Sequence, residues 1–252
     1  MLDGAEKLRF HDCDLYLLRN ARQFPDDMRR LEPDLLRLAT LARGWGPDKL
    51  DHMRQVFKID PFYNATAMAL VFNGDNLVGT AGVDTDFDAG RNDRHIVHLC
   101  SVNMDRSLRN SGLIAQLFVI LADQVLASLP PGDEVFFTSI SQSPLVYSIM
   151  SKIAPLHPDG RSRPPAPIVD VAGRVVAKYD PHLELEPDTL VLRRECDFFY
   201  RDVPYVSDTR INALFDSLLD IAAGDVFVNV GRTDVAGALS KIGRYQKRAA
   251  QL

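Results

Sequence analysis

The residues best suited to binding chemistry lie where a predicted strand turns into a predicted helix, in the segment 102–114. This segment holds small and polar residues together with Arg109 and Gly112. A backbone that turns from strand to helix exposes unpaired N–H groups at the positive end of the helix dipole. Such an end binds phosphate, and an arginine beside it adds a charge-assisted contact. The segment therefore predicts a site for the pyrophosphate of an adenine nucleotide or of coenzyme A.

Side chains on the predicted strand before this segment could take part in proton transfer or nucleophilic attack. His98 and Cys100 share one face of the preceding strand by its period of two, and His95 lies on the other face. His98 is the first candidate for a general base. Alternatively, its imidazole lies in the core and forms a hydrogen bond with a neighbouring residue. A cysteine and a histidine two positions apart on one strand rarely align as nucleophile and base, so Cys100 is interpreted as a small buried residue. Tyr147 lies on an apolar helix, where a tyrosine is typically a packing residue whose hydroxyl finds a hydrogen-bond partner.

The elements around the segment 102–114 predict a parallel β-α-β unit. The run 95–102 has the composition of a long strand, and apolar residues recur at helical spacing from Leu113 until the Pro-Pro-Gly at 130–132 ends the helix. A second strand follows over 134–140, and a crossover of that length favours parallel pairing. Ser143 then caps a further helix with Pro144 at its first position.

The rest of the chain predicts elements on both sides of this unit. Before it come a strand at 15–19, helices around 31–41 and 48–58, and a hairpin whose strands 67–72 and 77–83 are joined by Asn-Gly-Asp-Asn. After it come a proline-rich loop at 157–167, short strands at 168–171, 174–178 and 189–193, a helix at 211–221, a strand at 226–230 and a terminal helix at 234–249.

The order of these elements resembles that of the GNAT superfamily of acyl-CoA-dependent N-acyltransferases. The superfamily signature Arg/Gln-x-x-Gly-x-Gly/Ala is similar to the run from Arg109 to Ile114, which has the arginine and the first glycine but isoleucine at the last position. The run from Ser141 to Tyr147 resembles the second helix that contacts coenzyme A, without the asparagine and the Gly-Phe usual there. The resemblance implies an α/β (α+β) fold, with a mixed, mostly antiparallel sheet, one parallel β-α-β pair, helices on both faces, and a C-terminal α-β-α extension beyond it.

The resemblance also implies a reaction. An acyl group would pass from acetyl-CoA or another acyl-CoA, or from the pantetheine of an acyl carrier protein, to a small-molecule amine, with no metal. The backbone of residues 101–104 would polarise the thioester carbonyl and Tyr147 would protonate the leaving thiolate, with His98 as the candidate base. The residues implied to bind the cofactor are Val102, Met104, Arg109, Asn110, Ser111, Gly112, Leu113 and Ile114.

Composition bounds the class of protein. With 252 residues, 46% of them hydrophobic and 25% charged, the chain has the proportions of a globular protein, and its net charge of −5 offers no broad positive field for nucleic acid. Cys13, Cys100 and Cys196 are too widely spaced for a disulfide framework, which fits a reducing compartment. The apolar-rich region 113–129 falls short of the ~20 apolar residues of a membrane span. We therefore expect a cytoplasmic protein that partners neither nucleic acid nor membrane.

Two regions are expected, a GNAT-like acyltransferase core over 1–196 and a C-terminal extension over 197–252 that packs on the core. The apolar faces of the extension must be buried, since a strand and two helices of this size are marginal alone. The extension could cap the acceptor pocket or form the surface of a homodimer. Its basic residues between Lys241 and Arg248 complement the dipole at the end of a helix, with a contact to the 3′-phosphate of coenzyme A as the alternative.

Other functions stay open. The isoleucine at position 114 and the missing asparagine and Gly-Phe favour a non-catalytic GNAT-like module that binds or regulates. A serine hydrolase built on Ser139 or Ser141 is a weaker alternative, because neither serine lies in a Gly-x-Ser-x-Gly turn. Asp84 and Asp86 follow the hairpin and are interpreted as solvated loop carboxylates, with a contact to a cationic acceptor as the alternative.

Overall fold

The computed structural model describes residues 2–10, 12–56, 60–88, 90–108, 111–195 and 200–249. They form two compact units: unit 1 comprises Met1–Thr85 and Leu99–Ala127, and unit 2 comprises Asp86–His98 and Ser128–Leu252. The long strand β5 (Arg94–Met104) belongs to both, with residues 94–98 in unit 2 and residues 99–104 in unit 1. Each unit therefore takes half of this strand into its own sheet.

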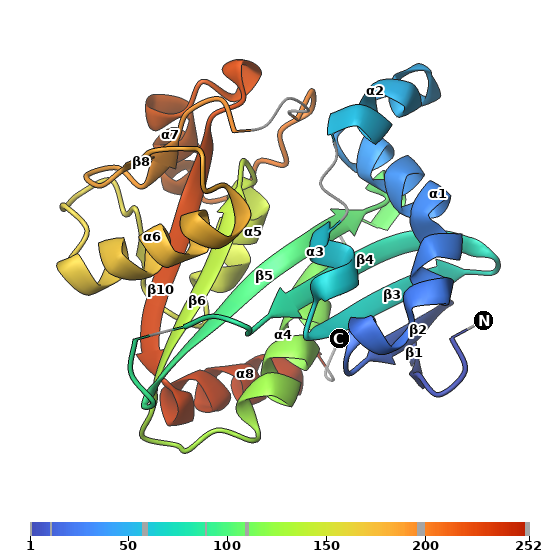
Figure 1. The fold of residues 1–252 in the computed structure, drawn as a ribbon, viewed down its shortest axis with the longest axis horizontal. Helices are drawn as coiled ribbons and strands as arrows, with labels where there is room; N and C mark the ends of the chain where they lie inside the picture. Colours follow the sequence, from blue (N-terminus) through green and yellow to red (C-terminus); the bar gives the residue numbers. More distant parts are fainter. Residues whose placement is uncertain are drawn as a thin grey trace. The chain divides into compact units, whose positions relative to one another are not determined.

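Unit 1 is built on strands in the order β1-β2-β3-β4-β5, with antiparallel neighbours from β1 to β4. Its strands are β1 (Glu6–Phe10), β2 (Cys13–Leu18), β3 (Ala67–Asn73), β4 (Asn76–Asp84) and the second half of β5. Its helices are α1 (Pro25–Ala42), α2 (Leu50–Val56), α3 (Asp60–Asn64) and α4 (Leu113–Leu126). Figure 1 shows α1 on one face of these strands and α4 on the other, and both helices contact β4.

Local signals account for most elements of unit 1. The helix α1 begins at Pro25, whose fixed φ suits a first turn, and buried residues such as Leu31 and Leu35 recur at helical spacing. The hairpin turn contains Gly74 at φ 58°, a value that glycine adopts without strain, and the predicted hairpin is confirmed. The strand β1 is not among the predicted elements, and its side chains are mostly exposed.

Unit 2 has strands in the order β5-β6-β10-β9-β8, and β7 also pairs with β10. Its strands are the first half of β5, β6 (Glu134–Ser141), β7 (Leu156–His157), β8 (Leu185–Glu186), β9 (Val191–Leu192) and β10 (Val226–Asp234). Its helices are α5 (Pro144–Met150), α6 (Ala166–Tyr179), α7 (Thr209–Leu218) and α8 (Val235–Ala249). The strands β5 and β6 pair in parallel from Arg94 opposite Glu134 to His98 opposite Thr138, which confirms the predicted β-α-β unit.

The strands predicted at 168–171 and 174–178 are wrong, because these residues form the single helix α6. Many of them are valine or isoleucine, which favour strands as isolated residues. Their buried members, including Ile168, Val171 and Val175, nevertheless recur at helical spacing and pack on β10 and β6. In Figure 1 this helix lies along the sheet of unit 2. Tertiary burial of one helical face therefore overrides the local preference for strand.

The strand β10 joins the C-terminal segment to the sheet of unit 2. It pairs antiparallel with β6 from Phe227 opposite Ser141 to Asp234 opposite Glu134, and it pairs with β9 through Val226 and Phe227. The predicted strand at 226–230 and the terminal helix, α8, are both present. Of the strand predicted at 189–193, only Val191 and Leu192 are extended as β9.

The fold class is confirmed. Antiparallel pairs dominate the sheets, β5 and β6 supply a parallel pair joined through the helix α4, and helices pack on the strands of each unit. This is the mixed α/β arrangement that the resemblance to the GNAT superfamily implies. In the described part of the chain, no helix combines the length and the apolar character needed to cross a membrane.

Candidate functional site

The turn between β5 and α4, in unit 1, is built from short local hydrogen bonds. The Asp105 N–H donates to the carbonyl of Val78 at 2.8 Å, which ties the end of β5 to β4. The Asp105 carboxylate accepts from the N–H and the hydroxyl of Ser107, in a short 3-10 turn over Arg106–Leu108. Arg109 and Asn110, two residues of the predicted cofactor site, lie outside the described residues. The structure therefore tests neither of them.

The start of α4 is open. Gly112 is its N-cap residue, with φ at 76°, and a side chain placed there would meet no atom within 4 Å. The Leu113 N–H donates to Ser111 Oγ at 3.2 Å, whereas the N–H groups of Ile114 and Ala115 have no acceptor among the described residues. Unpaired N–H groups at the first turn of a helix favour an anion. The predicted residues 111–114 thus lie together at an end that could bind phosphate.

Within the strand β5, Ser101 has a positive φ of 57°. Residues other than glycine rarely adopt this left-handed conformation, and serine gains nothing from it locally. The Thr80 hydroxyl, on β4, donates to the Ser101 carbonyl at 2.7 Å. The amide of Asn103 approaches the same carbonyl at 3.4 Å. Contacts across the sheet of unit 1 therefore hold Ser101 in its strained conformation.

A buried polar network supports these contacts. Asn103 is 3% exposed, and its side-chain oxygen accepts from the Arg43 guanidinium at 2.9 Å. Arg43 follows the last residue of α1 and also donates to the carbonyl of Ala39 at 3.2 Å. The C-terminal end of α1 is thereby linked through Asn103 to Ser101 and Thr80. Sequence patterns do not point to Arg43, Thr80 or Asn103, because the contacts that connect them into a network join residues far apart in the chain: Arg43 and Asn103 are 60 positions apart, and Thr80 and Ser101 are 21 apart.

Replacing Thr80 with valine tests whether its hydroxyl supports Ser101. Thr80→Val preserves the shape of a fully buried side chain but leaves the Ser101 carbonyl without its closest donor. We expect the free energy of unfolding to fall by about 1–3 kcal/mol, measured by urea denaturation. Thr80→Ser keeps the hydroxyl, so its free energy of unfolding should fall only by the smaller amount that the loss of one methyl group costs. A Thr80→Val protein as stable as the wild type would contradict this role.

The side chains of Cys100 and Met104 pack against β4. A Cβ atom on Gly82 would lie 3.1 Å from Cys100 Sγ, and one on Gly79 would lie 3.2 Å from Met104 Sδ. Gly79 and Gly82 are three positions apart, so they lie on opposite faces of β4. Cys100 and Met104 therefore contact opposite faces, although a regular strand would place them on one. The interpretation of Cys100 as a small buried residue is confirmed.

The other predicted cofactor contact on β5, Val102, lies one residue after Ser101 and is half-buried. Met104 is buried, and its side chain contributes to the core of unit 1. The interpretation of Asp84 as a solvated carboxylate is wrong, because Asp84 ends β4 and is 1% exposed. Asp86 is exposed, as expected.

His98 lies in unit 2, within a cluster of aromatic rings. It is 4% exposed, and its Nδ1 lies 2.9 Å from Thr138 Oγ1 on the neighbouring strand β6. Its ring centroid is 4.8 Å from that of Tyr179 and 5.9 Å from that of Phe87. The Lys178 ammonium covers the Phe87 ring at 4.3 Å. The imidazole is thus held in one orientation, which suits a base and a packed core residue alike.

Tyr147, also in unit 2, is buried on α5. Its hydroxyl donates to the carbonyl of Pro158 at 2.8 Å, and its ring meets Phe215 edge-on at 5.9 Å between centroids. Burial raises the pKa of Tyr147 to about 12, with a smaller contribution from the negative charge of Asp159. The phenol therefore keeps its proton at neutral pH, as a proton donor must. Ser143 caps α5 as predicted, accepting from the N–H of Val146.

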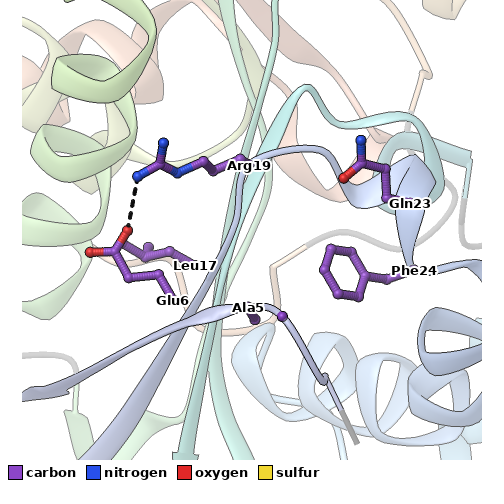
Figure 2. Close-up of a pocket in the computed structure, with 7 residues that line it drawn as sticks. Ala5, Glu6, Leu17, Arg19, Gln23 and Phe24 are labelled. Carbon is purple, nitrogen blue, oxygen red and sulfur yellow. Dashed lines mark hydrogen bonds and ion pairs between the residues drawn. The ribbon is translucent and has the colours of Figure 1, made fainter.

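A cavity of about 460 Å³ in unit 1 lies apart from the predicted residues. Figure 2 shows Arg19 and Glu6 on one side of it and Gln23 and Phe24 on the other. The Arg19 guanidinium is 3.4 Å from the Glu6 carboxylate, and both side chains are largely exposed. Exposed ion pairs of this kind contribute little free energy. Among the described residues, no group of three or more His, Cys, Asp or Glu side chains gathers as metal ligands.

Comparisons with known proteins find solved structures that are similar to this chain at low sequence identity. No family model and no curated protein matches the sequence. Among solved structures, the chain is similar to a probable GNAT-family acetyltransferase from Chromobacterium violaceum, at 12% identity over 93% of each chain with a TM-score of 0.39. It is similar to an uncharacterized protein from Bacillus halodurans, at 10% identity over 97% of each chain with a TM-score of 0.46.

A third similar structure is a GCN5-related N-acetyltransferase from Kribbella flavida, at 17% identity with a TM-score of 0.33. The match covers 54% of this chain and 32% of that one, so this chain spans about a third of the length of the Kribbella flavida protein. At these identities and TM-scores, the likenesses say nothing of a substrate.

Proposed function

We propose that this protein transfers an acyl group from an acyl-CoA to a small-molecule amine. The observation that carries the proposal is the open first turn of α4 after Gly112, where the N–H groups of Ile114 and Ala115 have no acceptor among the described residues. Unpaired N–H groups at a helix start suit a pyrophosphate, and Arg109, three positions before Gly112 in the sequence, would add a positive charge. A pantetheine carried by an acyl carrier protein is the alternative donor.

Acyl transfer to an amine makes three demands on this protein. The amine must lose a proton, the thioester carbonyl must be polarised, and the leaving thiolate must be protonated. We assign the base to His98, the polarising groups to the backbone of residues 101–104, and the acid to Tyr147. Burial raises the pKa of Tyr147, which keeps the phenol protonated at neutral pH and makes it a weaker acid than a solvated tyrosine. The C-terminal segment 197–252 would then cap the acceptor pocket or form a dimer surface.

Thermal unfolding with coenzyme A and with acetyl-CoA tests the donor. A ligand at about 100 times its dissociation constant adds about 2.7 kcal/mol to the free energy of unfolding, which is readily measured as a shift in Tm. We expect such a shift with both compounds. Native mass spectrometry of the purified protein should in addition detect a co-purifying CoA thioester. No shift with either compound, and none with acyl carrier protein, would exclude both forms of the donor.

Replacing Tyr147 with phenylalanine tests its role as the acid. A leaving-group acid acts only as the thiolate develops, so Tyr147→Phe should lower kcat about 100-fold and leave acyl-CoA affinity nearly unchanged. The substitution also removes the donor to the Pro158 carbonyl, which should cost about 1 kcal/mol of stability. Steady-state kinetics and urea unfolding separate these effects. If stability falls while kcat is unchanged, Tyr147 is a packing residue.

A non-catalytic module that binds an acyl-CoA is the second candidate. Two observations favour it: the Tyr147 hydroxyl already donates to a protein carbonyl, and a half-buried isoleucine occupies position 114 where the superfamily signature has a small residue. Such a module would show the Tm shift with coenzyme A but no release of free thiol when acetyl-CoA and a panel of amines are supplied. Thiol release above the rate of spontaneous hydrolysis would identify the enzyme.

A further inference from the structure

Ser101 combines two unfavourable features in one residue. Its backbone is left-handed at φ 57°, a conformation that strains any residue with a Cβ atom. Its side-chain hydroxyl is buried and has no hydrogen-bond partner in the described part of the chain. A buried hydroxyl without a partner loses its bonds to water and gains nothing in return. Neither feature helps the ligand-free protein to fold.

The contacts around Ser101 keep its hydroxyl unpaired. The Thr80 hydroxyl and the Asn103 amide both donate to the Ser101 carbonyl and not to its hydroxyl. Asn103 is in turn held by Arg43. The network therefore fixes the backbone of Ser101 and leaves its hydroxyl free. Strain that the surrounding structure enforces in this way is concentrated at functional sites in proteins.

We infer that the Ser101 hydroxyl is a hydrogen-bond donor reserved for the carbonyl oxygen of the bound acyl group. The inference rests on the proposed function, in which residues 101–104 lie beside the thioester. It assigns a side-chain donor in addition to the backbone groups. The hydroxyl keeps its proton and makes no covalent bond, and its bond to the carbonyl strengthens as negative charge develops on that oxygen. Coenzyme A lacks the acyl carbonyl, so the Ser101 hydroxyl forms no such hydrogen bond with it and does not contribute to its affinity.

Ser101→Ala tests the inference in the full-length protein, with isothermal titration calorimetry as the measure of affinity. We expect the dissociation constant of acetyl-CoA to rise about tenfold and that of coenzyme A to stay the same. We also expect the Tm of the ligand-free variant to equal or exceed that of the wild type, because an unpaired buried hydroxyl is removed. A serine with a merely structural role would show the opposite, a loss of Tm without discrimination between the two ligands.

Two further variants make the result specific. Ser101→Gly also removes the hydroxyl but relieves the left-handed strain, so it should raise the Tm further while losing the same affinity for acetyl-CoA. Ser151→Ala removes an exposed hydroxyl bonded to the carbonyl of Ser148 and should change neither affinity. Equal changes for the two ligands in Ser101→Ala, or none, would overturn the inference and leave the proposed function intact. Failure of both ligands to bind the wild type would overturn both.

Discussion

Ending the chain at Cys196 is expected to abolish cooperative folding, because the truncation removes β10 from the sheet of unit 2. Residues 226–231 of this strand are buried, and Phe227, Val228 and Val230 have no exposed surface. Burial of each such apolar side chain contributes about 1.5–3 kcal/mol. Their sum approaches the whole stability of a typical domain, about 5–15 kcal/mol. The truncated protein should therefore be insoluble, or should lack a cooperative unfolding transition in calorimetry.

A smaller change makes the same test if the truncated protein cannot be purified. Phe227→Ala leaves the chain complete and removes a ring that packs edge-on against Phe215 at 4.9 Å between centroids, so it should cost about 3–5 kcal/mol. Tyr205→Ala, an exposed aromatic in the same C-terminal segment, should cost about 1 kcal/mol or less. A soluble, cooperatively folded protein of residues 1–196 would show that the C-terminal segment is an independent appendage.

Replacing Gly112 with aspartate is expected to weaken acyl-CoA binding by about 100-fold or more. The Cβ atom would meet nothing within 4 Å, and aspartate tolerates a left-handed backbone better than most residues, so the protein should still fold. The new carboxylate would occupy the positive end of α4 and repel the phosphates that the proposed function places there. Calorimetry with coenzyme A measures the effect.

Gly112→Asn is the matched control for this prediction. Asparagine has the shape of aspartate and accepts the same backbone conformation, but it carries no charge. We expect it to weaken binding by less than about tenfold, and Arg109→Ala, which removes one partly solvated contact, should also have a smaller effect than Gly112→Asp. Similar losses for aspartate and asparagine would indicate a steric effect. Wild-type affinity in Gly112→Asp would place the phosphates elsewhere.

Much of the fold follows from interactions between residues that are close in sequence. The Asn-Gly turn joins β3 to β4, and Ser143 with Pro144 starts α5, as their local chemistry predicts. The helical spacing after Leu113 predicts α4, and the length of the crossover predicts the parallel pairing of β5 with β6. The open N-terminus of α4, on which the proposed function rests, is likewise predicted from residues that are close in sequence.

The sequence by itself therefore determined the order of most elements, the turn between β5 and α4, and the strand that bears His98. Tertiary structure alone decided that residues 166–179 form a helix, because the sheet of unit 2 buries its apolar face, and that Tyr179 and Thr138 orient His98. It also decided the strained backbone of Ser101, which depends on a hydroxyl 21 positions away. Propensity, capping and periodicity act over a few residues. A polar contact between strands arises only when the sheet brings its two partners together.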